Sequence, residues 1–252
     1  MIKYIFVIFL ILFTVSGCAK EEKIAEAPAA KPTSNLTENV TQQVETFTLT
    51  SGGDDAESNW QLEGDSADIV EDDVNLKNVR IKSKSKDSSV TMKAKTGMIR
   101  KREDKGIFKE DVVLAYDDGT TLTTDEIDWS FKSEAANAVG NVKMNTSSGS
   151  VIKCSGPLTL DYKKNIAVFN KDVSIENDKG SMSSKKMVVF FNPAKKNISR
   201  VEATGDVRLI RGNSVSMSEK AIYFIDDGKA ILTGNPIVFV DQEEARKASK
   251  EL

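Results

Sequence analysis

The sequence predicts an all-β protein, an elongated twisted jelly roll or open sandwich built from stacked two-strand repeats of about 31 residues. Three observations predict this fold: a period-2 alternation of apolar and polar residues, regularly placed turn residues, and apolar motifs that recur along the chain. In Ile127–Phe131, for example, Ile127, Trp129 and Phe131 alternate with polar residues, which places them on one face of a strand. No long stretch keeps the 3.6-residue period of a helix.

The first recurring motif is a small polar residue followed by an apolar residue, a spacer and a second apolar residue. Its copies begin at Asn78, Asp111, Asn141, Asp172, Asp206 and, imperfectly, Asn235. The first apolar positions are 79, 112, 142, 173, 207 and 236, so the intervals are 33, 30, 31, 34 and 29 residues. The motif therefore defines a period of about 31 residues, typical of repeat architectures.

A second motif follows the same rhythm. Its segments open at Ile127, Leu158, Met187 and Ala221 and continue two residues later as Trp129, Leu160, Val189 and Tyr223. Residues that tolerate positive φ lie between the motifs, at 117–119, 147–149, 177–180 and 226–228. Each repeat is therefore expected to contain two strands and two turns.

Two strands cannot bury their own apolar face, so such units must stack on their neighbours. Five or six stacked units predict a continuous apolar trough with an unpaired strand at each end. Each end could then add a strand from another protein through main-chain hydrogen bonds.

The N-terminal residues predict a membrane anchor. Residues 1–17 read as a signal peptide, because the apolar run from Tyr4 to Val15 is shorter than the roughly 20 residues that span a bilayer. Val15-Ser16-Gly17-Cys18 resembles a bacterial lipobox, which predicts lipidation of Cys18. Residues 18–46 are expected to be a flexible tether, since they are polar and lack aromatic residues up to residue 46. Two continuous blocks of repeats, 47–150 and 151–240, and a charged tail, 241–252, complete the predicted organisation.

The composition excludes several functions. The chain has no histidine, which removes His-based nucleophile triads and His-ligated metal sites, and its net charge of −3 does not attract nucleic acid. Lipidation of Cys18 would leave Cys154 without a disulfide partner. We therefore expect a non-enzymatic protein with no catalytic residues, no metal and no cofactor.

The inward-facing apolar residues are the candidate lipid-binding groove. They are expected to face acyl chains, with mutual packing as the alternative, and they are Val112, Leu114, Trp129, Phe131, Val142, Met144, Leu160, Tyr162, Val173, Ile175, Val189 and Phe191.

Two patterns of charged residues each allow a functional and a purely structural interpretation. Glu126 and Asp128 could form an acid/base pair, but the alternation with Ile127 points both carboxylates toward solvent. The alternating basic residues Arg80, Lys82, Lys84 and Lys86 could meet lipid phosphates or could protect an edge strand.

The repeats resemble the periplasmic lipopolysaccharide-export bridge family, the LptA/LptC or OstA-like proteins. Residues 60–67 and 76–79 are similar to the opening of the LptC branch, and residues 202–207 and 230–236 resemble the Gly-x-Val and Leu-x-Gly-x-Pro repeats of the LptA branch. The likeness extends from about residue 60 to 240. It implies a β jelly roll that shelters the acyl chains of lipopolysaccharide and pairs its edge strands with other bridge proteins and the inner-membrane ABC transporter complex.

The chain departs from the LptC pattern in two ways, since it carries an apparent lipid anchor in place of a membrane helix and has more repeats. The resemblance favours a periplasmic protein anchored to the inner membrane, although Ala19 does not match the Asp that often marks retention there. Two other functions stay open at this point. One is an envelope scaffold or adhesive lipoprotein with a dry β core, and the other is a polysaccharide lyase on a β-helix, which the short turns disfavour.

Overall fold

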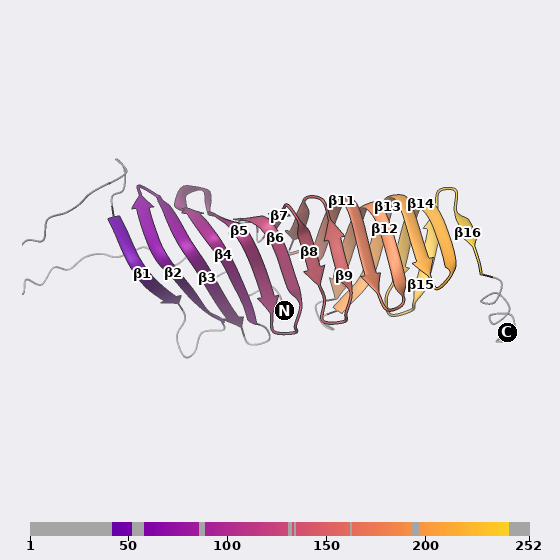
Figure 1. Ribbon diagram of the computed structural model, residues 1–252, viewed down its shortest axis with the longest axis horizontal. Helices are drawn as coiled ribbons and strands as arrows, with labels where there is room; N and C mark the ends of the chain where they lie inside the picture. The colour runs from indigo at the N-terminus through magenta and orange to yellow at the C-terminus, as the bar shows by residue number, and fades with distance from the viewer. Residues whose placement is uncertain are drawn as a thin grey trace, which may run out of the picture.

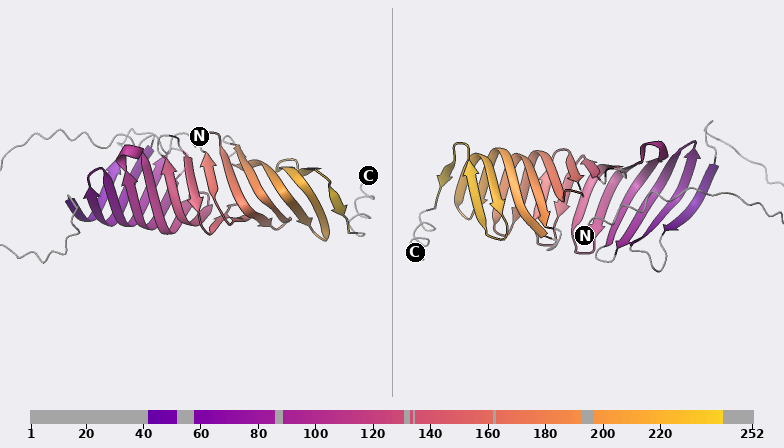
Figure 2. Two further views of the ribbon diagram at one scale, coloured as in Figure 1. Left: turned by 90° about the horizontal axis from the view of Figure 1, so that it is seen from above. Right: turned by 180° about the vertical axis from the view of Figure 1, so that it is seen from behind.

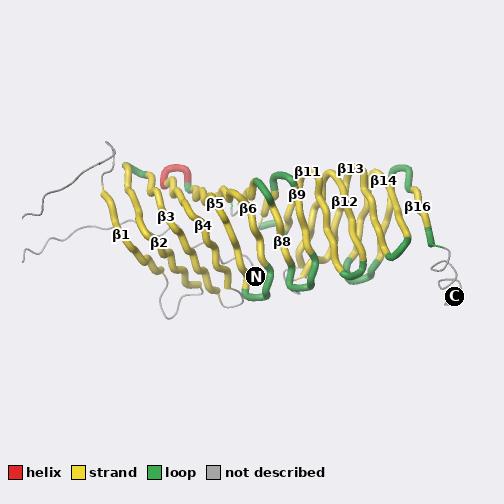
Figure 3. The backbone as a smooth tube through the Cα atoms, in the orientation of Figure 1, coloured by secondary structure: helices red, strands yellow, loops and turns green. Residues whose placement is uncertain are grey.

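The computed structural model describes residues 42–51, 58–85, 89–130, 133, 135–161, 163–192 and 197–241. These residues form one continuous antiparallel sheet, and a 3-10 turn at Lys101–Glu103 is its one helical element, as Figure 3 shows. The strands are β1 (Gln42–Ser51), β2 (Ser58–Val70), β3 (Asp73–Ser85), β4 (Ser89–Arg100), β5 (Lys105–Tyr116), β6 (Thr121–Ser130), β7 (Ala135–Val139), β8 (Val142–Asn145), β9 (Val151–Cys154), β10 (Leu158–Asp161), β11 (Ile166–Asn177), β12 (Gly180–Asn192), β13 (Asn197–Arg211), β14 (Ser214–Phe224), β15 (Lys229–Thr233) and β16 (Ile237–Phe239). The predicted all-β class is confirmed.

The sheet follows the order of the sequence along the long axis of the molecule (Figure 1). Successive strands pair from β1 to β7, and from β10 to β15. The order branches where a long strand is interrupted: β7 and β8 both pair with β6, β9 and β10 both pair with β11, and β15 and β16 both pair with β14. Each pair of short strands therefore occupies the place of one long strand.

The sheet folds over on itself along a line that crosses the middle of the strands. One whole face of the sheet is buried, from Phe47 to Ala221, although no helix covers it among the described residues. A single sheet can bury one face only against a second layer, so the two halves of each strand must form two facing walls. We call the wall that contains β8, β9 and β16 wall A, and the wall that contains β7, β10 and β15 wall B; Figure 2 shows the resulting elongated body from two further sides.

The fold line, which we call the crease, coincides with the first sequence motif. The small polar residue of each copy has positive φ, and in most copies the residue before it does as well; these residues are Asn78, Glu110, Asp111, Gly140, Asn141, Lys171, Asp172, Gly205, Asp206, Gly234 and Asn235. The strand register shifts next to the copies at Asp111, Asp172 and Asp206, for example between Thr204 and Val207. Two consecutive left-handed residues bend a strand as a β-bulge does, so the motif marks the bend of a strand.

Polar pairs close the outside of the crease. Lys95 Nζ lies 2.6 Å from Asp111 Oδ2, and Lys185 Nζ lies 2.8 Å from Asp206 Oδ2. These hydrogen bonds and the neighbouring carboxylates raise the pKa of both lysines above its ordinary value. Further along, Asn141 Nδ2 donates to an oxygen of Asp125 at 2.9 Å. Being exposed, these pairs add little stability but fix the register of the bent strands.

Hydroxyl groups satisfy the backbone on the inside of the crease. Ser184 and Ser218 each donate from Oγ, at 2.9 Å, to the carbonyl oxygen two residues later. Thr124 Oγ1 lies within hydrogen-bonding distance of three carbonyl oxygens and donates to the nearest, that of Gly140 at 2.9 Å. The buried hydroxyls thus replace the ladder hydrogen bonds that the bend removes.

The predicted tether extends too far along the chain. It was expected to end at residue 46, but β1 begins at Gln42 and pairs with β2 through the whole segment. Val44 packs against the core and Phe47 is buried, which explains why a stretch that is polar in composition joins the sheet. The signal peptide, Cys18 and the rest of the tether lie outside the described residues, as does the tail after Asp241.

Candidate functional site: the apolar trough

The interior of the folded sheet is lined by continuous cross-strand rows of apolar residues. In wall A, one row of directly paired residues runs the length of the molecule, and we call it row A. It consists of Leu49, Leu62, Ile81, Met92, Leu114, Leu122, Met144, Ile152, Ile175, Met182, Leu209, Ser216 and Val238. Ser216 is its one polar member.

Wall B contains the matching row, which we call row B. Its directly paired members are Val44, Ala67, Leu76, Gly97, Phe108, Ile127, Ala138, Leu158, Phe169, Met187, Ala203, Ala221 and Leu232. None of them has a polar side chain. A second inward row lies beside it in wall B and includes Trp129, Leu160, Val189 and Val201. The two sequence motifs therefore mark the two walls.

The structure buries most of the predicted groove residues. Val112, Leu114, Trp129, Val142, Met144, Leu160, Val173 and Val189 are buried, and Ile175 and Phe191 are partly buried against the core. Phe131 and Tyr162 lie outside the described residues. The described members thus lie on one inner face, whereas their contact with lipid stays a prediction.

The trough is tightly packed in its middle and open at its ends. Leu122 in row A and Phe169 in row B are 0% exposed, so side chains of the two walls fill the space between them. At the ends of row A, by contrast, Leu49 is 46% and Val238 is 54% exposed. An acyl chain could therefore reach an end directly but must part the walls to pass the middle.

The C-terminal end exposes the largest amount of apolar surface. Ile237, Phe239 and Val240 are each at least half exposed, and Ile231 on β15 is also exposed. The strands that carry them are the last of the sheet, so their outer edge has no partner strand among the described residues. This is the open end that the stacking of repeats predicted.

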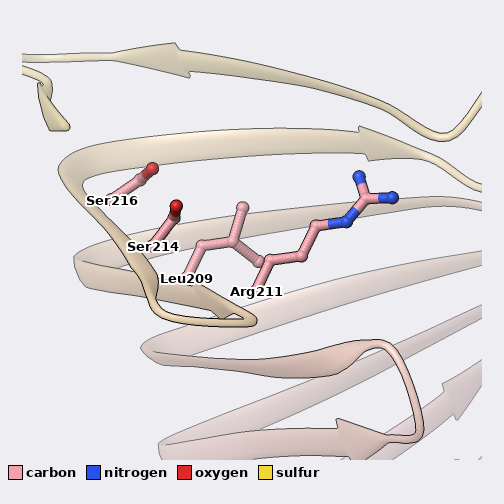
Figure 4. Close-up of a pocket in the computed structure, with 4 residues that line it drawn as sticks. All are labelled: Leu209, Arg211, Ser214 and Ser216. Carbon is pink, nitrogen blue, oxygen red and sulfur yellow. The ribbon is translucent and has the colours of Figure 1, made fainter. Parts of the chain in front are cut away.

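One pocket opens on the inner face close to this end. It has a volume of about 300 Å³ and is lined by Leu209, Arg211, Ser214 and Ser216 from the β13–β14 hairpin. In the view of Figure 4 the four side chains lie on the same side of the hairpin, with Leu209 between the two serines and the guanidinium of Arg211. This site was not predicted from the sequence, where its one signal is the departure of Arg211 and Ser216 from the apolar alternation.

In the structure, residues of both charged patterns form ion pairs on the surface. Glu126 lies on the outer face, where its carboxylate is 3.0 Å from Lys109 Nζ, and Asp128 shares that face, so the prediction that both point away from the core is confirmed. Of the basic stripe, Lys82 pairs with Glu63 at 3.1 Å, and Lys86 lies outside the described residues. The interpretation of the stripe as edge protection is wrong, because β3 lies between β2 and β4.

The remaining chemistry of the described residues is sparse. They contain no cluster of three or more His, Cys, Asp or Glu side chains that could hold a metal ion. Cys154 is a free thiol buried in wall A, and burial raises its pKa above the ordinary value. Among the same residues, no helix is long and apolar enough to cross a bilayer.

Comparison with known proteins identifies the C-terminal part of the trough. Residues 155–250 match the model of a family described as LptA/(LptD N-terminal domain) LPS transport protein. This segment is therefore similar to LptA-like transport proteins. The resemblance to the LptA/OstA-like family is thereby confirmed, and since the matched family is one of transport proteins, so is the expectation of a non-enzymatic protein.

The fold is also similar to that of solved structures. The crystal structure of LptH, described as the LptA homologous periplasmic component of the lipopolysaccharide transport device from Pseudomonas aeruginosa, superposes with a TM-score of 0.42 at 14% sequence identity. The likeness covers 48% of this chain and 94% of LptH. No curated protein sequence matches the chain.

Proposed function

We propose that the chain is a non-enzymatic periplasmic lipopolysaccharide transport protein that shelters acyl chains between its two walls and passes lipid along a bridge across the envelope. The observation that carries this proposal is the continuity of rows A and B from β1 to the last strands. The match of residues 155–250 to the LptA/(LptD N-terminal domain) family supports lipopolysaccharide as the class of cargo. The predicted lipid on Cys18 would hold the N-terminal end at a membrane.

The energetics of the trough favour this function. An acyl chain of about a dozen carbons costs on the order of 10 kcal/mol to expose to water, at about 0.8 kcal/mol per CH2. Inside the trough, its methylene groups would contact Leu122, Met144 and their neighbours instead of water. Parting the walls exchanges contacts between apolar side chains for contacts between side chains and lipid, so the cost of opening is largely offset.

Hand-over is expected at the open ends. The outer edge of the last strands and the exposed apolar residues around Phe239 suit addition of a strand from a bridge partner. Such a strand would extend both walls, so rows A and B would continue into the partner. We expect the inner-membrane ABC transporter complex to lie toward the anchored end.

A specific observation favours a second function. Residues in the middle of the trough, such as Val112 and Phe169, have no exposed surface, as expected for the dry core of an envelope scaffold. A scaffold would need the same anchor and the same stacked strands. The two functions differ in whether lipid ever occupies the space between the walls.

Photo-crosslinking in cells separates the two functions. A photoreactive amino acid at Met144 or at the partly buried Ile175 should capture lipopolysaccharide, because both side chains face the trough. The matched control is Lys143, which lies one residue away on the outer face and should capture none. If several inward positions fail in a protein that accumulates normally, the transport function is refuted and the scaffold stands.

A further inference from the structure

A charged side chain continues the inner face of wall A at its C-terminal end. Rows A and B themselves contain no charged residue over their described length. Arg211 continues the inward alternation of Val207 and Leu209 on β13, directly opposite Ser214. Its guanidinium therefore lies on the trough side of the sheet, at the rim of wall A.

Arg211 has no internal ionic partner to explain it. The ion pairs of the described residues use Lys82, Lys95, Lys185, Arg200 and other cations, but not Arg211. The guanidinium also makes no hydrogen bond to a described residue, and it is exposed. Its five donors, in a planar fork, are therefore available to a ligand.

The surroundings of Arg211 have the two parts of an amphiphile site. On one side, Leu209 continues into Met182 and Ile175 of row A, which suits an acyl chain. The hydroxyl groups of Ser214 and Ser216 line the same pocket of about 300 Å³, with Leu209 between them and the guanidinium (Figure 4). Ser214 Oγ also accepts the backbone N–H of Asp241 at 3.2 Å, which holds Asp241 beside the β13–β14 hairpin.

We propose that this pocket binds the phosphate headgroup of an acylated amphiphile, with Arg211 as the anion-binding residue and row A as the track for the acyl chain. Arginine pairs with phosphate oxygens through two parallel N–H donors, and Ser216 Oγ adds a donor from the neighbouring strand. The site lies at the open C-terminal end, where a lipid leaves or enters the trough. This inference rests on the proposed transport function and adds to it a specific headgroup contact.

The test uses the mature full-length chain and two fluorescent probes with the same acyl chain, lysophosphatidic acid and the neutral monoacylglycerol. Arg211→Gln should weaken binding of the phosphate probe about tenfold, as expected for loss of a charge-assisted contact at an exposed site. Binding of the neutral probe should not change. Arg211→Lys should retain part of the affinity, because it keeps the charge and loses the planar fork.

Arg208→Gln is the matched control. Arg208 lies three residues earlier on β13 and is exposed on the outer face, opposite Ser183 and Met217. If Arg208→Gln weakens the phosphate probe as much as Arg211→Gln does, the effect comes from net charge and the site is refuted. Equal weakening of both probes by Arg211→Gln would likewise refute it, because that outcome indicates a structural role.

Further outcomes show whether the pocket binds free phosphate and whether the headgroup site fails alone or together with the transport function. Inorganic phosphate at the concentration of the probe should not displace it, since the acyl chain supplies much of the affinity; displacement would assign the pocket to free phosphate. Wild-type protein that binds both probes equally well would overturn the headgroup site alone. Binding of neither probe would overturn the proposed transport function together with it.

Discussion

Truncation of Phe169 tests whether the two walls pack as a core. Phe169 on β11 is 0% exposed and lies in row B between Leu158 and Met187, which are also buried. Replacement of a fully buried Phe by Ala costs about 3–5 kcal/mol of unfolding free energy, through lost transfer energy and a residual cavity. Phe169→Ala should therefore lose stability in this range.

Phe224→Ala is the control of equal side-chain change. Phe224 lies on β14, opposite Arg200 and Lys229 on the outer face, and is only partly buried. Its truncation should cost about 1 kcal/mol, because most of the surface that it covers is already near water. The free energies of unfolding can be measured by urea denaturation, followed by circular dichroism. Equal losses in the two variants, or a loss below about 1 kcal/mol for Phe169→Ala, would refute the assignment of inner and outer faces.

Two further predictions concern the backbone and the buried thiol. Gly180→Ala should destabilise the protein by several kcal/mol, because φ is +146° and a Cβ would clash with the carbonyl oxygen of Ile210. The control is Gly149→Ala, at φ +82° with open space around it, which should cost only about 1 kcal/mol in the same urea assay. Burial raises the pKa of the Cys154 thiol, so the folded state favours the neutral thiol. The stabilisation that the neutral thiol provides is therefore present below the ordinary thiol pKa and is lost as pH rises toward the folded-state pKa. In a Cys18→Ser variant, iodoacetamide should therefore alkylate Cys154 far more slowly in the folded protein than in the urea-unfolded protein between pH 7 and 9. Equal alkylation rates would contradict the burial of Cys154.

The sequence predicted both walls because each has its own periodic signal. The residues at Val112, Val142, Val173 and Val207 recur beside the crease, and Ile127, Leu158 and Met187 recur in row B. Alternation at a period of 2 decides which side chains share a face, and this local rule survives in a bent strand. The inward residues could therefore be listed without knowledge of the fold.

The bend itself could not be predicted from the same signals. Asn and Asp before the valine read as turn or strand-end residues, because they tolerate positive φ. In the structure Asp172 and Asp206 lie in the middle of long strands, where a left-handed pair redirects the chain without ending the pairing. The position of a strand within the sheet was equally hidden, which is why edge protection was a wrong explanation for the lysines of β3.

The pocket at Arg211 needed the register of three strands. Leu209, Ser216 and Val238 become neighbours only through the pairing of β13 with β14 and of β14 with β16. No local pattern reveals that an arginine at the end of β13 lies at the end of an apolar row that gathers residues from Leu49 to Val238.

The modular construction of the sheet has a consequence for the reach of the molecule. Strands contact mainly their immediate neighbours, so insertion of one 31-residue unit would add two strands, about 10 Å of length at roughly 4.8 Å per strand, without disturbing the others. Gene duplication within such a chain changes span in fixed increments while the cross-section stays constant. A change in the number of repeats would thus adjust the length of the protein to the width of the cell envelope, while the cross-section of the trough stays the same.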